Sequence, residues 1–116
     1  MPLADQLKPC GPVVDAKAAE RLRIAVAARL WTPGLERAWP ALAPVFAASP
    51  YLSSLARRDP ERLDALLADD PQARLDDILT RTVAARDLDG EAAAARLREL
   101  KAELHLLTAL ADLGGV

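Results

Sequence analysis

The 116-residue sequence has few of the residues that build reactive or cross-linked sites. It contains one cysteine, one histidine and only 3% aromatic residues, and its formal net charge is −2. The single cysteine, Cys10, excludes a disulfide within the chain, and one cysteine with one histidine is too few for a structural zinc site. The missing basic excess argues against nucleic-acid binding, which depends on lysines and arginines that neutralise phosphates. We therefore expect a chain of a reducing, cytoplasmic compartment.

Long apolar runs are also missing. No stretch approaches the roughly 18 uninterrupted apolar residues of a membrane span, and Asp5 and Lys8 lie where a secretory signal would be apolar. Alanine and leucine, both strong helix formers, dominate the sequence, whereas strand-forming residues are sparse. We expect no membrane segment and an all-α fold, with an irregular array of short helices and a longer antiparallel helix pair.

Prolines divide the chain into segments. Three prolines and a glycine predict an irregular leader over residues 1–14, followed by a single helical domain or fragment over 15–116. Ser49-Pro50, Asp59-Pro60 and Asp70-Pro71 each combine an N-cap residue with a proline at the first helical position, so each pair predicts a new helix. The prolines at 40 and 44 predict either one kinked helix or two short ones between 35 and 48.

The longest helices are expected at about 71–88 and 91–113. In the first, an apolar stripe indicates one side facing a core; it comprises Leu75, Ile78, Leu79, Thr82 and Val83. The last helix has leucines on two sides of its second half, which require burial, while its first half is half-exposed. If those leucines lack a cover in the isolated chain, they predict self-association.

Candidate catalytic and metal-binding groups each have a simpler structural interpretation. Asp87 and Asp89 have the spacing of magnesium ligands in nucleotidyltransferases, but they lie at a helix junction, where a solvated helix end with Asp89 as N-cap is favoured. His105 lies on a polar helical stripe with no nucleophile placed beside it. The sequence also has no glycine-rich phosphate loop. We therefore assign no catalytic, cofactor-binding or metal-binding residue.

Four cations form a candidate docking surface: Arg57, Arg58, Arg98 and Lys101. The pair at 57 and 58 precedes Asp59-Pro60, so it has two interpretations. It can complement the dipole at a helix C-terminus, which we favour, or it can contact a partner.

Two segments resemble a known family. Residues 47–63 combine a short helix, a basic pair, Asp-Pro and a leucine-rich helix; residues 97–101 read Leu-Arg-Glu-Leu-Lys, and an apolar stretch follows over 106–116. Together they are similar to the N-terminal region of the glutamine synthetase adenylyltransferase/adenylyl-removing enzymes. The resemblance covers about residues 47–116. It departs from the family at Ala102, Glu103 and His105, where members usually carry arginines.

The resemblance implies a role in the control of nitrogen assimilation. Enzymes of this family transfer AMP from ATP to a tyrosine of glutamine synthetase and remove it by phosphorolysis, with magnesium and under control of a PII protein. Their nucleotidyltransferase motif, a Gly-Gly turn before an Asp-x-Asp strand, is absent here and would lie beyond Val116. We therefore expect a truncated, non-catalytic helical segment of this nucleotidyltransferase, although whether the chain has enzymatic activity stays open.

The implied partners are the rest of the parent enzyme, glutamine synthetase and a PII protein, while ATP and magnesium belong to the full-length family members. An alternative is a self-contained helical adaptor that binds a partner helix through exposed apolar surface.

Overall fold

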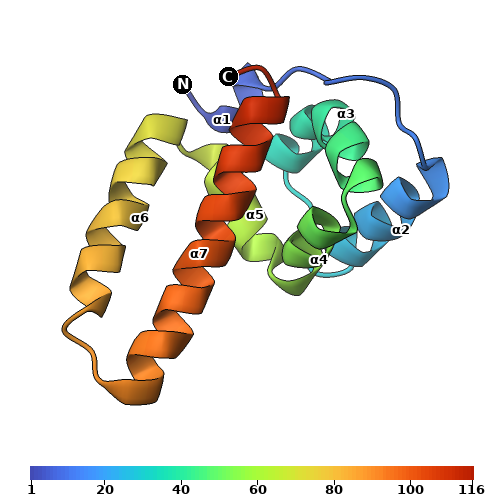
Figure 1. Cartoon of the computed structure of the whole chain (residues 1–116). Coiled ribbons are helices and arrows are strands. Elements are labelled where there is room, and N and C mark those ends of the chain that lie inside the picture. The colour runs from blue at the N-terminus through green and yellow to red at the C-terminus, as the bar shows by residue number, and fades with distance from the viewer.

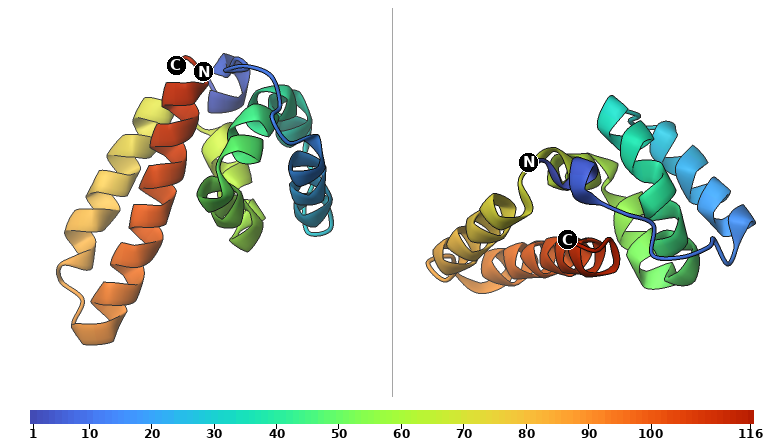
Figure 2. Two further views of the ribbon diagram at one scale, coloured as in Figure 1. Left: turned by 45° about the vertical axis from the view of Figure 1, so that its right-hand side comes forward. Right: turned by 90° about the horizontal axis from the view of Figure 1, so that it is seen from above.

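The computed structural model describes all 116 residues and contains seven α-helices and no strand, as the composition predicted (Figure 1). In chain order the helices are α1 (Leu3–Gln6), α2 (Ala16–Ala27), α3 (Pro33–Ala48), α4 (Pro50–Arg58), α5 (Pro60–Ala68), α6 (Pro71–Ala85) and α7 (Gly90–Leu113). None of them combines the length and the apolar character that a membrane crossing would require. Helices α6 and α7 form an antiparallel hairpin, and the shorter helices form an irregular group beside it (Figure 2).

The proline pairs begin α4, α5 and α6, as predicted. The side chains of Ser49, Asp59 and Asp70 each accept a hydrogen bond from the backbone N–H three residues later, at 3.2, 3.1 and 3.1 Å. Asp89 occupies the corresponding position before α7, but its side chain makes no capping hydrogen bond. Asp89 therefore holds the predicted N-cap position, but the capping hydrogen bond expected there is not formed. The chain enters α7 through Gly90, whose φ of 52° is a left-handed conformation that favours glycine.

Helix α3 lies at the centre of the short helices and contacts α1, α2, α4 and α5. Its residues 33–48 form one continuous helix that includes both Pro40 and Pro44, so the alternative of two short helices is wrong. Leu42, Val45 and Phe46 of α3 are buried in the core. Burial of this apolar side supplies the free energy that offsets the backbone hydrogen bonds lost at the two prolines.

The hairpin buries its two helices unequally. In the second half of α7, Leu106, Leu107 and Leu110 are buried where the helix contacts α3, α4 and α5. The chain itself therefore covers these three of the leucines expected to drive self-association, whereas Leu104 is half-buried and Leu113 is 44% exposed. On α6 the predicted core-facing stripe is only partly right, because Leu79 and Val83 are 52% and 59% exposed. The reason is that α6 packs mainly on α7, so the side that carries these residues has no neighbour.

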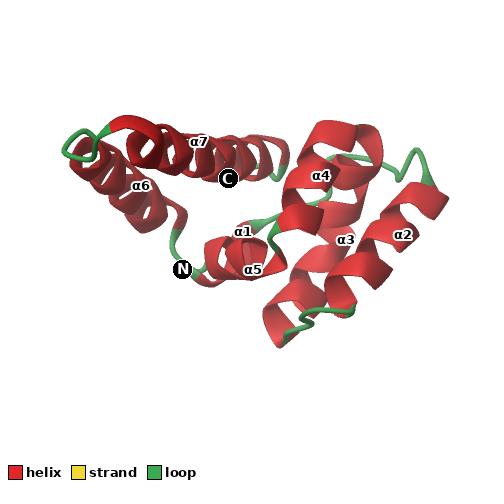
Figure 3. Ribbon diagram, turned by 90° about the horizontal axis from the view of Figure 1, so that it is seen from below, coloured by secondary structure: helices red, strands yellow, loops and turns green.

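The predicted irregular leader contains a short helix that docks on the core. Leu3 of α1 is fully buried, and its backbone N–H donates to the carbonyl of Asp69 at 2.8 Å. The Lys8 N–H donates to the carbonyl of Gly114 at 2.9 Å, which joins the two ends of the chain (Figure 1). Seen from below, α1 and α5 lie between the hairpin and the group of α2, α3 and α4 (Figure 3).

Candidate docking groove

A shallow groove lies where α4 ends and α5 begins, facing the first half of α7. The chain turns there because Asp59 ends α4 and caps α5, which leaves Arg58 and Arg62 on either side of the turn. The groove has a volume of about 380 Å³. Its lining residues come from both sides of the turn and from α7: Arg58, Asp59, Arg62, Ala95, Arg98, Glu99 and Ala102.

The groove continues into a second hollow between α5 and the hairpin. This hollow has a volume of about 410 Å³, and none of its lining residues is hydrophobic. Asp59, Arg62 and Glu99 line both hollows, so the two form one continuous polar surface. The only acidic side chain buried in the molecule, Glu103, lies in the second hollow.

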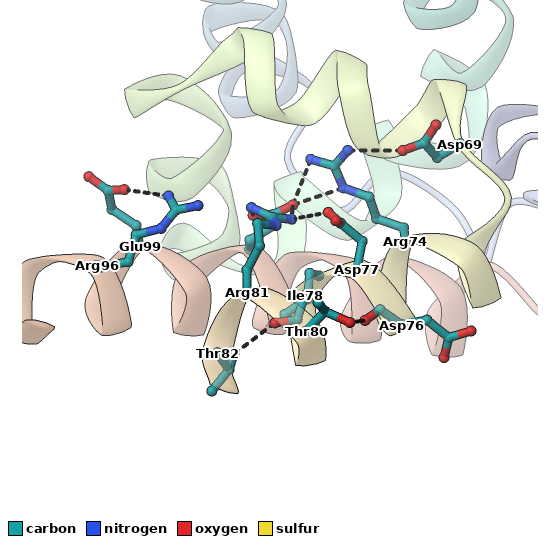
Figure 4. A network of polar contacts seen from close by, with 11 residues as sticks. Asp69, Arg74, Asp76, Asp77, Ile78, Thr80, Arg81, Thr82, Arg96 and Glu99 are labelled. Atoms are coloured by element: carbon teal, nitrogen blue, oxygen red, sulfur yellow. Dashed lines mark hydrogen bonds and ion pairs between the residues drawn. The ribbon is translucent and has the colours of Figure 1, made fainter. Parts of the chain in front are cut away.

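Two arginines of α6 hold the Glu103 carboxylate. Arg74 Nε donates to Glu103 Oε1 at 2.8 Å, and Arg81 donates to both carboxylate oxygens, at 3.0 and 2.8 Å. Asp69 and Asp77 pair with the outer sides of the same arginines, at 2.9 and 2.7 Å (Figure 4). Such bidentate, charge-assisted bonds fix orientation, so this network sets how α6 lies against α7.

The charges of the network stabilise one another. Burial by itself raises the pKa of Glu103, but the hydrogen bonds from Arg81 and Arg74 outweigh it, and the pKa lies below its ordinary value. For Arg74, burial opposes the charged form, while the hydrogen bonds to Asp69 and Glu103 raise the pKa above its ordinary value. Glu103 and Arg74 are therefore both charged at neutral pH and form a structural ion pair.

The outer groove has cations without ionic partners. Arg58, Arg62 and Arg98 form no ion pair, and the Nε of Arg62 is buried without a hydrogen-bond partner. The nearby acids are already in use, because Asp59 caps α5 and Glu99 pairs with Arg96 at 3.2 Å. The groove is thus locally positive on a chain whose net charge is −2. Such a surface suits carboxylates of a partner.

The structure separates the four cations that the sequence singled out. Arg58 and Arg98 line the same groove although they are 40 positions apart in the sequence. Arg57 lies on the other side of α4 and lines a hollow together with Asp15 and Arg21 of the α2 region. Lys101 is exposed on α7 and is not among the residues that line the groove.

Sequence reasoning missed Arg62 and the ion pairs of Glu103. A signal was present for Glu103, which follows Leu100 by three positions and precedes Leu107 by four, so it lies on the buried side of α7. A lone acid in such a position needs a buried partner. No comparable pattern marks Arg74 and Arg81 as its partners.

The other candidate groups lie apart from the groove. Asp87 and Asp89 are exposed in the turn of the hairpin, and Cys10 is an exposed thiol. His105 is half-buried, and its Nδ1 lies 2.8 Å from the hydroxyl of Tyr51 on α4. No three histidine, cysteine, aspartate or glutamate side chains are grouped so that they could hold a metal ion.

Comparison with known proteins identifies the family of this chain. The family model for glutamate-ammonia ligase adenylyltransferase matches residues 39–116, about two thirds of the chain. The chain belongs to this family. Its resemblance to the adenylyltransferases, seen first in residues 47–116, is thereby confirmed, and both hollows of the groove lie within the matched region.

Curated adenylyltransferases are much longer than this chain. The bifunctional glutamine synthetase adenylyltransferase/adenylyl-removing enzyme of Caulobacter vibrioides is 56% identical over 98% of the chain, which spans only 12% of that enzyme. Enzymes of the same description from Bradyrhizobium sp. and Rhodopseudomonas palustris are 49% and 47% identical over 59% and 66% of the chain. No solved structure matches.

Proposed function

We propose that this adenylyltransferase chain is a non-catalytic helical segment of a cytoplasmic enzyme that adenylylates and deadenylylates glutamine synthetase, with a scaffolding and docking role. The proposal includes glutamine synthetase, a PII protein and the rest of the longer enzyme as partners. ATP and magnesium would be used by the full-length enzyme, outside the residues of this chain.

One observation carries the docking role: Arg58, Arg62 and Arg98 line one groove without ionic partners. Leaving three arginines unpaired gives no stability to the fold, whereas a carboxylate surface of a partner would complement them. The scaffolding role is supported by the network around Glu103, whose charged groups are all used to hold α6 on α7. Neither arrangement supplies a nucleophile or a general base.

The docking role can be tested by binding of the isolated chain to purified glutamine synthetase of Caulobacter vibrioides, measured by biolayer interferometry. The double variant Arg58→Glu/Arg98→Glu is expected to weaken binding by at least about tenfold, because both substitutions place negative charge in the groove. The matched control is Lys17→Glu/Arg21→Glu, which changes the net charge equally on exposed positions of α2. It should bind within about twofold of the unmodified chain.

Two results would overturn the proposal. Equal loss of binding in both double variants, or no binding by the unmodified chain, would remove the docking role. Release of AMP from adenylylated glutamine synthetase by this chain, with phosphate and magnesium present, would show that the segment is catalytic.

A further inference from the structure

A second polar hollow lies between α2 and α4, apart from the outer groove. Figure 3 shows α2, α3 and α4 as neighbouring helices, and α4 contacts both of the others. The hollow has a volume of about 350 Å³. Its lining includes Asp15 and Arg21 at the start of α2, Phe46 of α3, and Ser53 and Arg57 of α4. None of these residues lines the outer groove, so the hollow is a separate surface feature.

The two arginines of this hollow have no ionic partner. Arg21 and Arg57 are exposed, and neither forms an ion pair. The only acid in the lining is Asp15, whose Oδ1 accepts a hydrogen bond from the Ala18 N–H at 3.0 Å and so caps α2. The lining therefore carries two positive charges and one negative charge. An anion between the arginines would offset their mutual repulsion.

The hollow also offers donors other than the arginines. Ser54 donates its hydroxyl hydrogen to the Tyr51 carbonyl at 2.7 Å, whereas the hydroxyl of the half-buried Ser53 forms no hydrogen bond. Helix α2 begins beside the hollow, and its first turn contains Lys17 but no acidic residue. The positive end of the α2 dipole thus adds to the charge of the arginines. The outer groove, by comparison, has no hydroxyl group in its lining.

We propose that this hollow binds a phosphoryl group, supplied by inorganic phosphate or by a small phosphomonoester. Arg21 and Arg57 pair with its oxygens, and the Ser53 hydroxyl donates to another oxygen. A phosphoryl group carries a charge of about −1.5 to −2 and three strong acceptor oxygens, so it matches this donor set better than a singly charged carboxylate does. The volume is near the lower end of the range of about 300–1,000 Å³ for ligand pockets, which fits a small ligand.

Titration of the whole isotope-labelled chain with inorganic phosphate, followed in amide NMR spectra, tests the site. Saturable shifts are expected for the first residues of α2 and for residues 50–57 of α4. Arg21→Gln/Arg57→Gln should raise the dissociation constant at least about tenfold, because the charge-assisted hydrogen bonds of both side chains are lost. Both side chains are exposed, so the variant keeps the fold, which the dispersion of the same spectra verifies.

The matched control is Arg58→Gln/Arg98→Gln, which removes the same charge from the outer groove. Its dissociation constant for phosphate should stay within about twofold of that of the unmodified chain. Arg21→Gln/Arg57→Gln should in turn bind glutamine synthetase as the unmodified chain does, so failure of this site and failure of the docking role are distinguishable. Unchanged phosphate affinity in Arg21→Gln/Arg57→Gln, equal weakening in both double variants, or shifts that never saturate would overturn the site.

Two further ligands identify the chemistry. Acetate should bind at least about tenfold more weakly than phosphate, because it has less charge and fewer acceptor oxygens. Equal affinities for acetate and phosphate would contradict the assignment to a phosphoryl group. Phenyl phosphate should bind through the same two arginines. Tighter binding than that of inorganic phosphate would identify a phosphomonoester as the ligand, and weaker binding would identify the free ion.

Discussion

Glu103 of α7 is the one acidic side chain that the fold buries, and it lies between two guanidinium groups of α6. Its side chain is 5% exposed, while those of Arg74 and Arg81 are 18% and 26% exposed. Burying three charges costs desolvation free energy, which their attraction and hydrogen bonds offset only while all three are present. Removal of one of these charges should therefore lower the free energy of unfolding by more than the whole network contributes to it, because the remaining charges stay buried without their partner.

Glu103→Ala is expected to lower the free energy of unfolding by about 2–3 kcal/mol, because both arginines lose their buried partner. This decrease is smaller than the one expected when a fully buried ion pair is broken, because each arginine keeps its outer aspartate and is partly exposed to solvent. Urea denaturation measures the change. The control is Glu99→Ala, which removes an ion pair to Arg96 from a carboxylate that is 64% exposed and should cost less than about 0.5 kcal/mol. Equal losses in the two variants would contradict the role given to Glu103.

The lowered pKa of Glu103 also predicts a dependence of stability on pH. Because the folded-state pKa lies below the ordinary value of 4.5, the ionised carboxylate stabilises the fold above that value, and this stabilisation is lost as pH falls through the folded-state pKa. The stability difference between the unmodified chain and Glu103→Gln should thus be largest at neutral pH and shrink under acid conditions. Urea denaturation of both proteins over this pH range provides the measurement. If the stability difference between the two proteins increased as the pH fell, the pKa of Glu103 would not be lowered by folding.

At the same scale, sequence reasoning could predict only part of the groove. Arg58 and Arg98 were identifiable as exposed cations, because one ends a helix before Asp59 and the other lies on a polar stripe of α7. Their common groove depends on how α4 crosses α7, which neither helix encodes by itself. The pairing of Glu103 with Arg74 and Arg81 depends in the same way on the register of the hairpin.

At the scale of the helices, local sequence was the better guide. The starts of α4, α5 and α6 were predictable because a cap and a proline act within one turn, with no help from the rest of the fold. The side of α6 that faces a core was not predictable, since Ile78 and Leu79 are equally apolar and only the position of α7 decides between them. Asp89 does precede α7 as expected, but its side chain forms no capping hydrogen bond, and the next residue, Gly90, has a left-handed backbone.

The caps therefore give a prediction at this scale. Asp59→Ala should lower the free energy of unfolding by about 1 kcal/mol, because the first turn of α5 loses the acceptor for one of its free N–H groups. Asp89→Ala is the matched control: its side chain makes no capping bond, and the loss should stay within about 0.5 kcal/mol. Thermal unfolding followed by circular dichroism compares the two. A larger loss for Asp89→Ala would show that this carboxylate does cap α7.

At the scale of the whole molecule, the first residues of the chain hold the two groups of helices together. Helix α1 contacts α3 and α5, and residues 3 and 8 donate backbone hydrogen bonds to Asp69, just before α6, and to Gly114, just after α7. The composition of residues 1–14 indicated an irregular leader because the segment contains three prolines and a glycine. The tertiary contacts of Leu3 and Leu7 override that local preference, and no local pattern could reveal them.

If this docking is part of the fold, Leu3→Ala should destabilise the whole chain. The Leu3 side chain is fully buried, and its truncation leaves a cavity between α1, α3 and α5, with an expected loss of about 2–5 kcal/mol. For a molecule of this size, each kcal/mol lowers Tm by about 4–8 °C, so calorimetry should show one transition at a clearly lower temperature. Val14→Ala, at a position that is 73% exposed, should leave Tm nearly unchanged. An unchanged Tm for Leu3→Ala would mean that α1 does not contribute to the core, and that the hairpin and the short helices are joined only through α3, α4 and α5.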